Sequence, residues 1–309
     1  MATTLVITND FPPTVGGIEA FIAQLCDLLG DVVVLTRTHP GATTADHARP
    51  YPIHRQGRLL LPTAHTLRSA KELLSRHRAT RVIFGAAAPL GLLAPGLRAA
   101  GASHMLAITH GHETWWATLP GTRQALRRIG DHVTAVSTIS TFTHQMIAPA
   151  LSPAAQTAMV RLAPPVDTHR FVPTAQPHGS ATPTVVAAGR FIAQKGFDVL
   201  LTAWALVVAA WPQDRPEPRL LLIGDGPETP RLQAQASALP RRDTVTFTGP
   251  VSHEQMPHHL ARGQVFALPV RTRWGGLNPE GLGLVFAEAA ACGLAVVAGD
   301  SGGTRDTLI

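Results

Sequence analysis

The chain has 309 residues, 45% hydrophobic and 15% charged, which suits a globular protein of two ordinary domains and excludes a disordered chain. Its formal net charge of +6 favours anionic partners such as nucleotide phosphates or lipid headgroups. Two distant cysteines give no disulfide framework, and no run reaches the roughly 20 apolar residues that a membrane-spanning helix needs.

The first half of the chain alternates short β-branched runs with longer helical patterns, which is typical of a parallel α/β sheet. Helices such as 17–29 and 122–130 are predicted between strands at 4–8, 32–36, 81–85, 104–109 and 133–136. Residues 162–179 contain four prolines, so this stretch can be neither a continuous helix nor a central strand. The sequence therefore predicts a first domain at 1–172 and a linker at 173–183.

A second series of the same kind follows and predicts another domain at 184–309. Its predicted strands are 184–188, 220–224, 245–248, 265–268 and 295–298. Its predicted helices are 196–210, 229–239, 253–262 and 283–292. Both halves are thus expected to be α/β, Rossmann-like, doubly wound domains that face one another across a cleft, with ligands at the carboxyl ends of the strands.

The first motif, TNDFPPTVGG, directly follows the first predicted strand and ends in Gly16 and Gly17. Adjacent glycines at the start of a helix let the backbone approach a ligand closely and direct free N–H groups at an anion. An isolated Gly-Gly pair is more often an ordinary strand-to-helix turn.

A second motif, Gly189-Arg190-x4-Lys195-Gly196, follows the first strand of the second domain. The planar fork of Arg190 and the compact charge of Lys195 could together hold the two phosphates of a diphosphate. Charges on loops are more often solvated surface pairs. The chain has only two lysines, however, and one of them stands here.

The third motif, NPEGLGLVFAE, runs from residue 278 into a predicted helix and contains Glu280 and Glu288. Gly281 and Gly283 free the backbone at the helix start, which suits phosphate contact. Glutamate at a helix start is also favoured by the helix dipole, so the carboxylates alone are weak evidence. Their combination with the glycines makes the pattern informative.

A His-x-His pair, His110 and His112, follows the predicted strand 104–109. Such a pair could bind zinc, but no third ligand occurs at a recognisable spacing. The chain also has no Asp-x-Asp motif, which argues against a metal-bridged donor. We therefore expect no bound metal.

Together these motifs resemble family four of the retaining glycosyltransferases, which carry a Glu-x7-Glu motif, here Glu280 and Glu288. The resemblance covers essentially the whole chain and implies the GT-B fold. The segments TNDFPPTVGGIE and THGHETWWATLPGTRQALRRIG are most similar to the actinobacterial phosphatidylinositol mannosyltransferases that add a second, α-1,6-linked mannose. This implies GDP-mannose as the donor, a glycolipid acceptor, and neither a cofactor nor a tightly bound metal.

The resemblance also implies roles for matching residues, with His112 and Glu280 as catalytic. His112 would lie near the C6 hydroxyl of the sugar, with His110 as the alternative, and Glu280 would position the mannose. The implied donor-binding residues are Gly16, Gly17, Arg190, Lys195, Val251, Gly281, Leu282, Gly283, Leu284 and Glu288. Among them, Arg190 and Lys195 would neutralise the diphosphate, Glu288 would hold the ribose, and Val251 would contact the nucleobase.

The sequence leaves three alternatives open. The chain could be a family-four glycosyltransferase that uses another nucleotide-sugar donor, one that uses a soluble acceptor, or an inactive fragment that binds a nucleotide sugar. The last is kept because family members continue with further strands and helices where this chain stops, so we expect an incomplete C-terminal domain. Nucleic acid is not an expected partner, since aromatic residues make up only 5% of the chain and supply few stacking platforms.

The N-terminus has no basic segment typical of a signal peptide, which predicts a cytoplasmic protein. Basic residues concentrate in the first domain and favour peripheral binding to the anionic inner face of the cell membrane, although a solvated helix face would look the same. They are Arg55, Arg58, Arg68, Lys71, Arg76, Arg78, Arg81, Arg123, Arg127 and Arg128.

Overall fold

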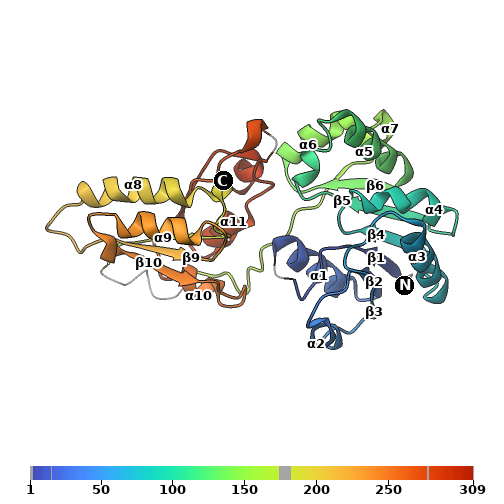
Figure 1. The fold of residues 1–309 in the computed structure, drawn as a ribbon, viewed down its shortest axis with the longest axis horizontal. Coiled ribbons are helices and arrows are strands. Elements are labelled where there is room, and N and C mark those ends of the chain that lie inside the picture. Colours follow the sequence, from blue (N-terminus) through green and yellow to red (C-terminus); the bar gives the residue numbers. More distant parts are fainter. Residues whose placement is uncertain (1–2, 15, 174–181, 277, 309) are drawn as a thin grey trace. The chain divides into compact units, whose positions relative to one another are not determined.

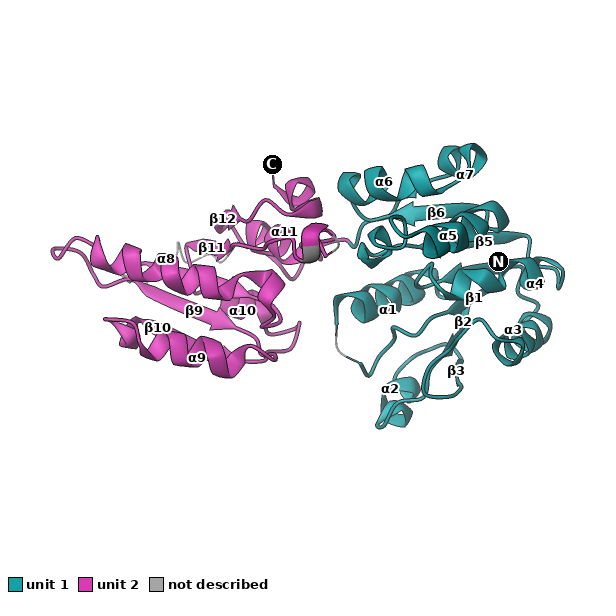
Figure 2. Ribbon diagram, turned by 45° about the horizontal axis from the view of Figure 1, so that its top comes forward, with its two compact units in different colours: residues 1–164 teal, residues 165–309 magenta. Residues whose placement is uncertain are grey.

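The computed structural model describes residues 3–14, 16–173, 182–276 and 278–308. They form two compact units, residues 1–164 and 165–309, each built around its own parallel sheet (Figures 1 and 2). Phe171 is buried in the core of the second unit, so the segment after Pro164 packs there, although the sequence assigned 165–172 to the first domain. The predicted linker 173–183 lies largely outside the described residues.

The first unit contains a seven-stranded sheet in the order β3-β2-β1-β4-β5-β6-β7, with every neighbouring pair parallel. Its strands are β1 (Thr4–Ile7), β2 (Val32–Thr36), β3 (Ile53–Arg55), β4 (Arg81–Phe84), β5 (His104–Ile108), β6 (Ala135–Thr138) and β7 (Val160–Arg161). Its helices are α1 (Gly17–Leu29), α2 (Ala42–His47), α3 (Ala64–Arg76), α4 (Ala94–Arg98), α5 (Pro120–His132), α6 (Thr141–Ile147) and α7 (Pro153–Thr157).

Both faces of this sheet are covered, because successive side chains of a strand point to opposite sides. In β1, Leu5 and Ile7 join the core that includes Leu73 of α3, whereas Val6 packs in a second core with Ile22 of α1. The result is a three-layer unit with helices on either side of the sheet (Figure 1).

The second unit contains a five-stranded parallel sheet in the order β10-β9-β8-β11-β12. Its strands are β8 (Thr184–Ala188), β9 (Arg219–Ile223), β10 (Val245–Gly249), β11 (Val265–Leu268) and β12 (Ala295–Ala298). Its helices are α8 (Phe197–Ala209), α9 (Thr229–Ser237), α10 (Met256–Leu260) and α11 (Leu284–Ala291). A single core surrounds this sheet, with Phe266 of β11 edge-on to Phe286 of α11 at 5.7 Å between ring centroids.

The predicted doubly wound α/β fold is confirmed, and every predicted strand lies within two residues of its predicted bounds. β6 begins at Ala135 because Val133 caps α5, donating its N–H to the Ile129 carbonyl. α10 is shorter than predicted because Ser252 and Gln255 form a separate turn before it. Strands β3 and β7 and helices α2, α3, α4, α6 and α7 were not identified from the sequence.

The strand order reverses between β1 and β4 in the first sheet and between β8 and β11 in the second. Ligands of such sheets bind beyond the carboxyl ends of the strands at this reversal. The loop after β1 carries the Gly-Gly motif, and the loop after β5 carries the His-x-His motif. In the second unit, the loop after β8 carries the motif with Arg190 and Lys195, and the loop after β11 carries the motif with Glu280. None of the described helices is long and apolar enough to cross a membrane.

Candidate functional site

The loop after β8 is folded into a short 3-10 turn, Ala193–Lys195, that ends at Gly196. Gly196 has φ of +72° and caps the start of α8. A Cβ at this position would lie 2.0 Å from the carbonyl oxygen of Pro269, the residue after β11. Glycine is therefore required both by the backbone conformation and by the close approach of the two loops.

This approach brings together two of the predicted site residues. The Lys195 Nζ lies 2.7 Å from Glu280 Oε2, and both side chains are mostly buried, with exposures of 19% and 12%. Gln194 also donates to the Pro279 carbonyl across 2.8 Å. An ammonium group has three donors, so Lys195 can hold Glu280 and still offer N–H groups to an anion. Arg190, five residues earlier, is exposed at the start of the same loop.

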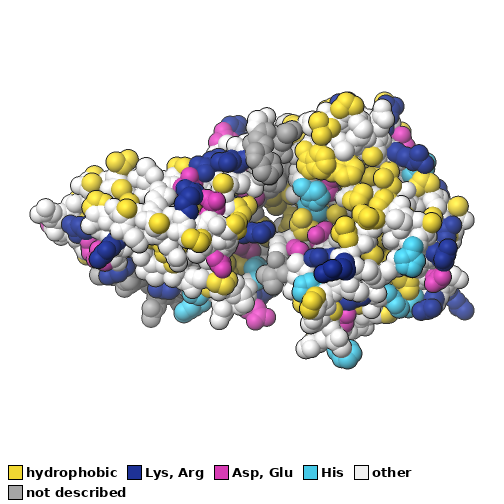
Figure 3. All heavy atoms as spheres, in the orientation of Figure 1, with side chains coloured by type: hydrophobic (Ala, Val, Ile, Leu, Met, Phe, Trp, Pro, Cys, Tyr) yellow, Lys and Arg dark blue, Asp and Glu magenta, His cyan; other side chains and the backbone are white. Residues whose placement is uncertain are grey.

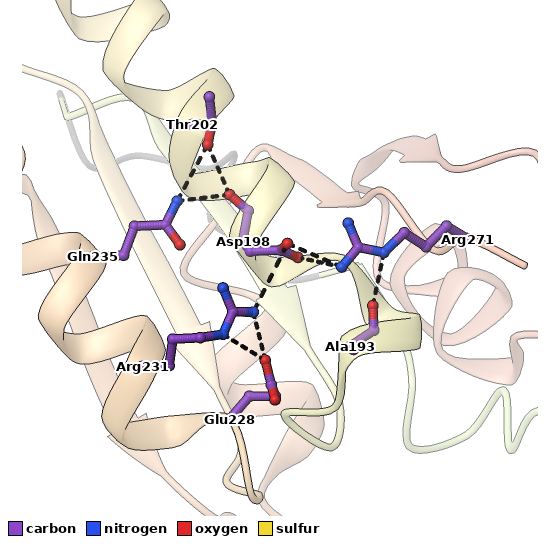
Figure 4. A network of polar contacts seen from close by, with 7 residues as sticks. All are labelled: Ala193, Asp198, Thr202, Glu228, Arg231, Gln235 and Arg271. Carbon is purple, nitrogen blue, oxygen red and sulfur yellow. Dashed lines mark hydrogen bonds and ion pairs between the residues drawn. The ribbon is translucent and has the colours of Figure 1, made fainter. Parts of the chain in front are cut away.

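Arg271 fastens this turn from the loop after β11 (Figure 4). Its Nε donates to the Ala193 carbonyl at 2.9 Å, and its Nη2 donates to both carboxylate oxygens of Asp198 at 3.0 and 2.9 Å. Its backbone N–H donates to the Gln194 carbonyl. Arg231 of α9 approaches the same Asp198 carboxylate at 3.8 Å. The turn that carries Lys195 is thus held on both sides by one arginine.

Glu280 is held in turn by the segment after β12. Its backbone N–H donates to Ser301 Oγ at 3.2 Å, and its carbonyl accepts the N–H of Gly303 at 2.8 Å. The Ser301 hydroxyl also contacts that of Thr272 at 2.8 Å. The position of Glu280 therefore depends on residues more than 20 positions away in the sequence.

Glu288 lies eight residues after Glu280, in the second turn of α11, and its side chain is only 8% exposed. Its Oε1 is 2.8 Å from Nε2 of His253, which belongs to the loop between β10 and α10. Val251 lies in that loop, half-buried against the core. The structure therefore brings together the loop predicted to contact the nucleobase and the carboxylate predicted to hold the ribose.

Residues Gly281, Leu282 and Gly283 connect Glu280 to α11, whose first residue is Leu284. The cap residue Gly283 has no side chain to accept hydrogen bonds from the first turn of the helix. The first backbone N–H groups of a helix have no partner within it, and the dipole places partial positive charge there. This part of the loop is suited to an anion, next to the ammonium of Lys195.

In the first unit, Gly16 caps α1 and Gly17 is its first residue. The Glu19 carboxylate lies over the turn, since a Cβ at Gly16 would meet its Oε2 at 2.2 Å. Burial raises the pKa of Glu19, as does the nearby Asp10, against the lowering effects of its own backbone N–H and of Arg37. An anion approaching the predicted Gly16–Gly17 site would therefore meet the Glu19 carboxylate.

Two arginines hold the loop between β1 and α1. Arg37 donates to the Asn9 carbonyl at 2.9 Å and to the Thr14 hydroxyl at 3.0 Å. Arg55 donates to the Pro12 carbonyl at 2.5 Å and pairs with both oxygens of the Asp46 carboxylate. The interpretation of Arg55 as a membrane-facing charge was therefore wrong, because its guanidinium is engaged inside the unit and only 10% exposed.

The His-x-His motif lies in the loop after β5. His110 packs edge-on to Phe21 of α1, and its Nε2 donates to the Gly85 carbonyl at 2.5 Å. His112 is 43% exposed, with its Nε2 3.2 Å from Oε1 of the fully buried Glu113. The ring of His110 is thus occupied by the backbone, whereas that of His112 is accessible, so a ligand contact is more compatible with His112.

The buried His110 also predicts a pH dependence of stability. Burial lowers the pKa of His110, although Glu113 and the Gly85 carbonyl favour the protonated form. Below about pH 6.5, the ordinary histidine value, the unfolded chain binds a proton that the folded chain excludes. We therefore expect the free energy of unfolding to fall as the pH drops through this range. In denaturant titrations, His110→Gln should reduce this decline, whereas His65→Gln, at an exposed position, should leave it unchanged.

Sequence reasoning did not find four residues that support the site: Glu113, Asp198, His253 and Arg271. Only Asp198 and Glu113 lie beside a motif, and nothing in the local sequence distinguishes them from ordinary surface charges. His253 and Arg271 act on partners 35 and 73 positions away, which only the fold brings near.

A model of the family described as "Glycosyl transferases group 1" matches residues 172–309. Over the whole chain, the sequence is 39% identical to a GDP-mannose-dependent alpha-(1-6)-phosphatidylinositol monomannoside mannosyltransferase of Mycobacterium tuberculosis, covering 100% of this chain and 83% of that protein. The protein of the same name from Mycolicibacterium smegmatis is 40% identical, and the match covers 99% of this chain and 82% of that protein.

Among solved structures, Anabaena Alr3699/HepE in complex with UDP and glucose is similar, with a TM-score of 0.76. The match covers 99% of this chain and 83% of that one at 16% sequence identity. At this identity the likeness concerns the fold.

Proposed function

The chain belongs to the group 1 glycosyltransferases of GT-B fold, and we propose that it transfers mannose from GDP-mannose to a phosphatidylinositol mannoside-type glycolipid with retention of configuration. The observation that carries the proposal is the Lys195–Glu280 pair beside the start of α11, at the strand-order reversal of the second sheet. A cation, free helix N–H groups and a carboxylate meet there, which suits a sugar diphosphate. The mannose and the lipid acceptor are proposed because the two mycobacterial relatives are GDP-mannose-dependent phosphatidylinositol monomannoside mannosyltransferases.

We assign the donor-binding roles as follows. Arg190 and Lys195 neutralise the diphosphate together with the backbone at Gly281–Leu284, and Glu280 positions the mannose. Glu288 accepts the ribose hydroxyls, and the Val251 loop contacts the nucleobase. In the first unit, Gly16 and Gly17 contact donor phosphate, which requires the Glu19 carboxylate to move away from the turn, and His112 contacts the sugar.

The proposed reaction needs no protein nucleophile beneath C1 of the sugar. The bond from C1 to the diphosphate oxygen breaks, the acceptor oxygen bonds C1 on the same face, and the acceptor proton passes to the leaving diphosphate. Catalysis then depends on orientation and on stabilising the charge of the leaving group. Lys195 and the helix N–H groups supply that stabilisation.

The test of the function is incubation with radiolabelled GDP-mannose and a mycobacterial lipid extract. We expect a labelled glycolipid that does not form without the protein. Label recovered only in a water-soluble product, or no labelled glycolipid at all, would contradict the proposal.

We predict that GDP stabilises the protein more than UDP does. A ligand that binds only the folded state stabilises it by an amount that grows with the logarithm of the ligand concentration divided by its Kd, so the tighter of two nucleotides at equal concentration raises the melting temperature more. Thermal-shift titrations with equal concentrations of the two nucleotides measure the difference. Equal stabilisation by UDP would count against GDP-mannose as the donor.

We also propose that the first unit binds anionic membrane surfaces peripherally. Lys and Arg side chains lie along the rim of this unit beside α3 and α4 (Figure 3). With Arg55 excluded, all the basic residues predicted for this surface are exposed, namely Arg58, Arg68, Lys71, Arg76, Arg78, Arg81, Arg123, Arg127 and Arg128. Each of these side chains contributes about 1 kcal/mol to the free energy of binding when it lies near an anionic membrane surface.

Flotation with anionic and neutral vesicles tests this prediction. We expect binding to the anionic vesicles at low salt and its loss at high salt, because screening weakens the attraction. The double variant R68A/R76A, altered on α3, should bind less than R215A/R242A, two exposed arginines of the second unit. Binding that is independent of lipid charge would refute the proposal.

A further inference from the structure

Glu113 is a fully buried carboxylate beside the accessible ring of His112. Its Oε2 accepts the backbone N–H of His110 at 2.9 Å. Its Oε1 is also buried and has no hydrogen-bond partner among the described residues, although His112 Nε2 lies 3.2 Å away. This separation is within ion-pair range, but the two groups form no hydrogen bond in the structure.

A buried polar atom without a partner costs about 1–3 kcal/mol, so Oε1 has a strong preference for a donor. The ring of His110 cannot be this donor, because its Nε2–H is already bonded to the Gly85 carbonyl. Of the two side chains only the ring of His112 is exposed, so rotation of that ring is the movement that can bring its Nε2–H into line with Oε1. Since an ionised carboxylate only accepts hydrogen bonds, this bond specifies which nitrogen of His112 carries the proton.

We propose that Glu113 is a positioning residue that holds His112 as the Nε2–H tautomer and leaves Nδ1 to face the ligand as an acceptor. The inference rests on the proposed function for its consequence, because His112 is assigned there to the sugar. With Nδ1 unprotonated, His112 accepts a hydrogen bond from a sugar hydroxyl. The Glu113 charge behind the ring also favours the positive charge that develops on the sugar as the leaving group departs.

A purely structural role for Glu113 is the alternative, since the bond to the His110 N–H closes the loop by itself. The variant Glu113→Gln separates the two roles. Glutamine has the same size and its carbonyl can still accept from His110, but its NH₂ then faces His112 and can only donate. Nε2 of His112 must become the acceptor, so the proton moves to Nδ1.

The tautomer is measured directly in the ¹⁵N-labelled full chain by two-bond ¹H–¹⁵N correlation, well above the ordinary pKa range of histidine. The signals of His112 are identified by their absence in His112→Gln. We expect Nε2–H in the wild type and Nδ1–H in Glu113→Gln. The control Glu72→Gln, an exposed glutamate of α3, should leave the spectrum of His112 unchanged. The same tautomer in wild type and Glu113→Gln would overturn the proposal.

Kinetics with GDP-mannose and the lipid acceptor give the second readout. We expect Glu113→Gln to lower kcat by roughly ten- to a hundredfold, the usual effect of losing a carboxylate that orients a functional histidine, with little change in the donor KM. An unchanged kcat in a variant whose tautomer has reversed would refute the positioning role in transfer. Full activity of His112→Gln would instead contradict the assignment of His112 to the sugar, while the tautomer result would still stand.

Discussion

Replacing Lys195 or Glu280 by alanine is expected to remove most transfer activity without unfolding the protein. Lys195 is the cation proposed to neutralise the leaving diphosphate, and loss of one such charge-stabilising group typically lowers kcat on the order of 10²–10³-fold. Glu280→Ala is expected to act through the position of the sugar. Both residues lie on loops outside the hydrophobic core, so truncation leaves no large core cavity. Arg215→Ala, an exposed cation of the same unit, is the control and should retain wild-type turnover.

The ion pair between the two side chains raises a second explanation, in which they merely hold the two loops together. Removing one partner of a mostly buried pair leaves the other charge uncompensated, whereas removing both charges is often nearly neutral for stability. The double variant K195M/E280Q should therefore regain the melting temperature lost in either single variant. Its activity should remain as low as that of Lys195→Ala. Recovery of turnover along with stability would show that the pair is structural.

Much of this architecture could be predicted because its signals are local. Ten of the twelve strands in the described structure were predicted. Their alternating or continuous apolar runs, bounded by turn residues, are the usual signals of strands in a parallel sheet. Strand β7 was missed because it has only two residues, both exposed. Helix α3 has a clear amphipathic pattern and a Thr63 cap, so its signals were present in the sequence.

The site was predictable where a motif carries its own chemistry and not where partners come from elsewhere. Lys195 and Glu280 were found in separate motifs 85 residues apart, and the structure places them in contact. Arg55 shows the opposite case, because its local sequence is that of a surface charge and only Asp46 and Pro12 reveal its buried role. Arg271 and Ser301 likewise have no motif of their own, since their function is to hold residues that do.

Gly196→Ala is expected to have the second large effect, through the geometry of the turn that carries Lys195. The substitution places a Cβ 2.0 Å from the Pro269 carbonyl oxygen, which is too close for any side-chain atom, and no flexible side chain can yield there. The Lys195 turn and the loop after β11 must therefore separate. A displacement of about 1 Å at a reacting group can lower activity on the order of a hundredfold.

An alanine at position 196 would also be strained by the left-handed backbone conformation alone. Gly41 provides the control for this backbone strain. Gly41 also caps a helix, has φ of +76° against +72° for Gly196, and has open space where a Cβ would lie. Gly41→Ala should therefore lose only the roughly 1–2 kcal/mol that a left-handed non-glycine residue costs, and should keep its activity. Gly196→Ala should lose more stability than this, measured by denaturant titration, and most of its turnover. Equal stability losses in the two variants, with turnover kept in both, would mean that the contact with Pro269 does not position Lys195.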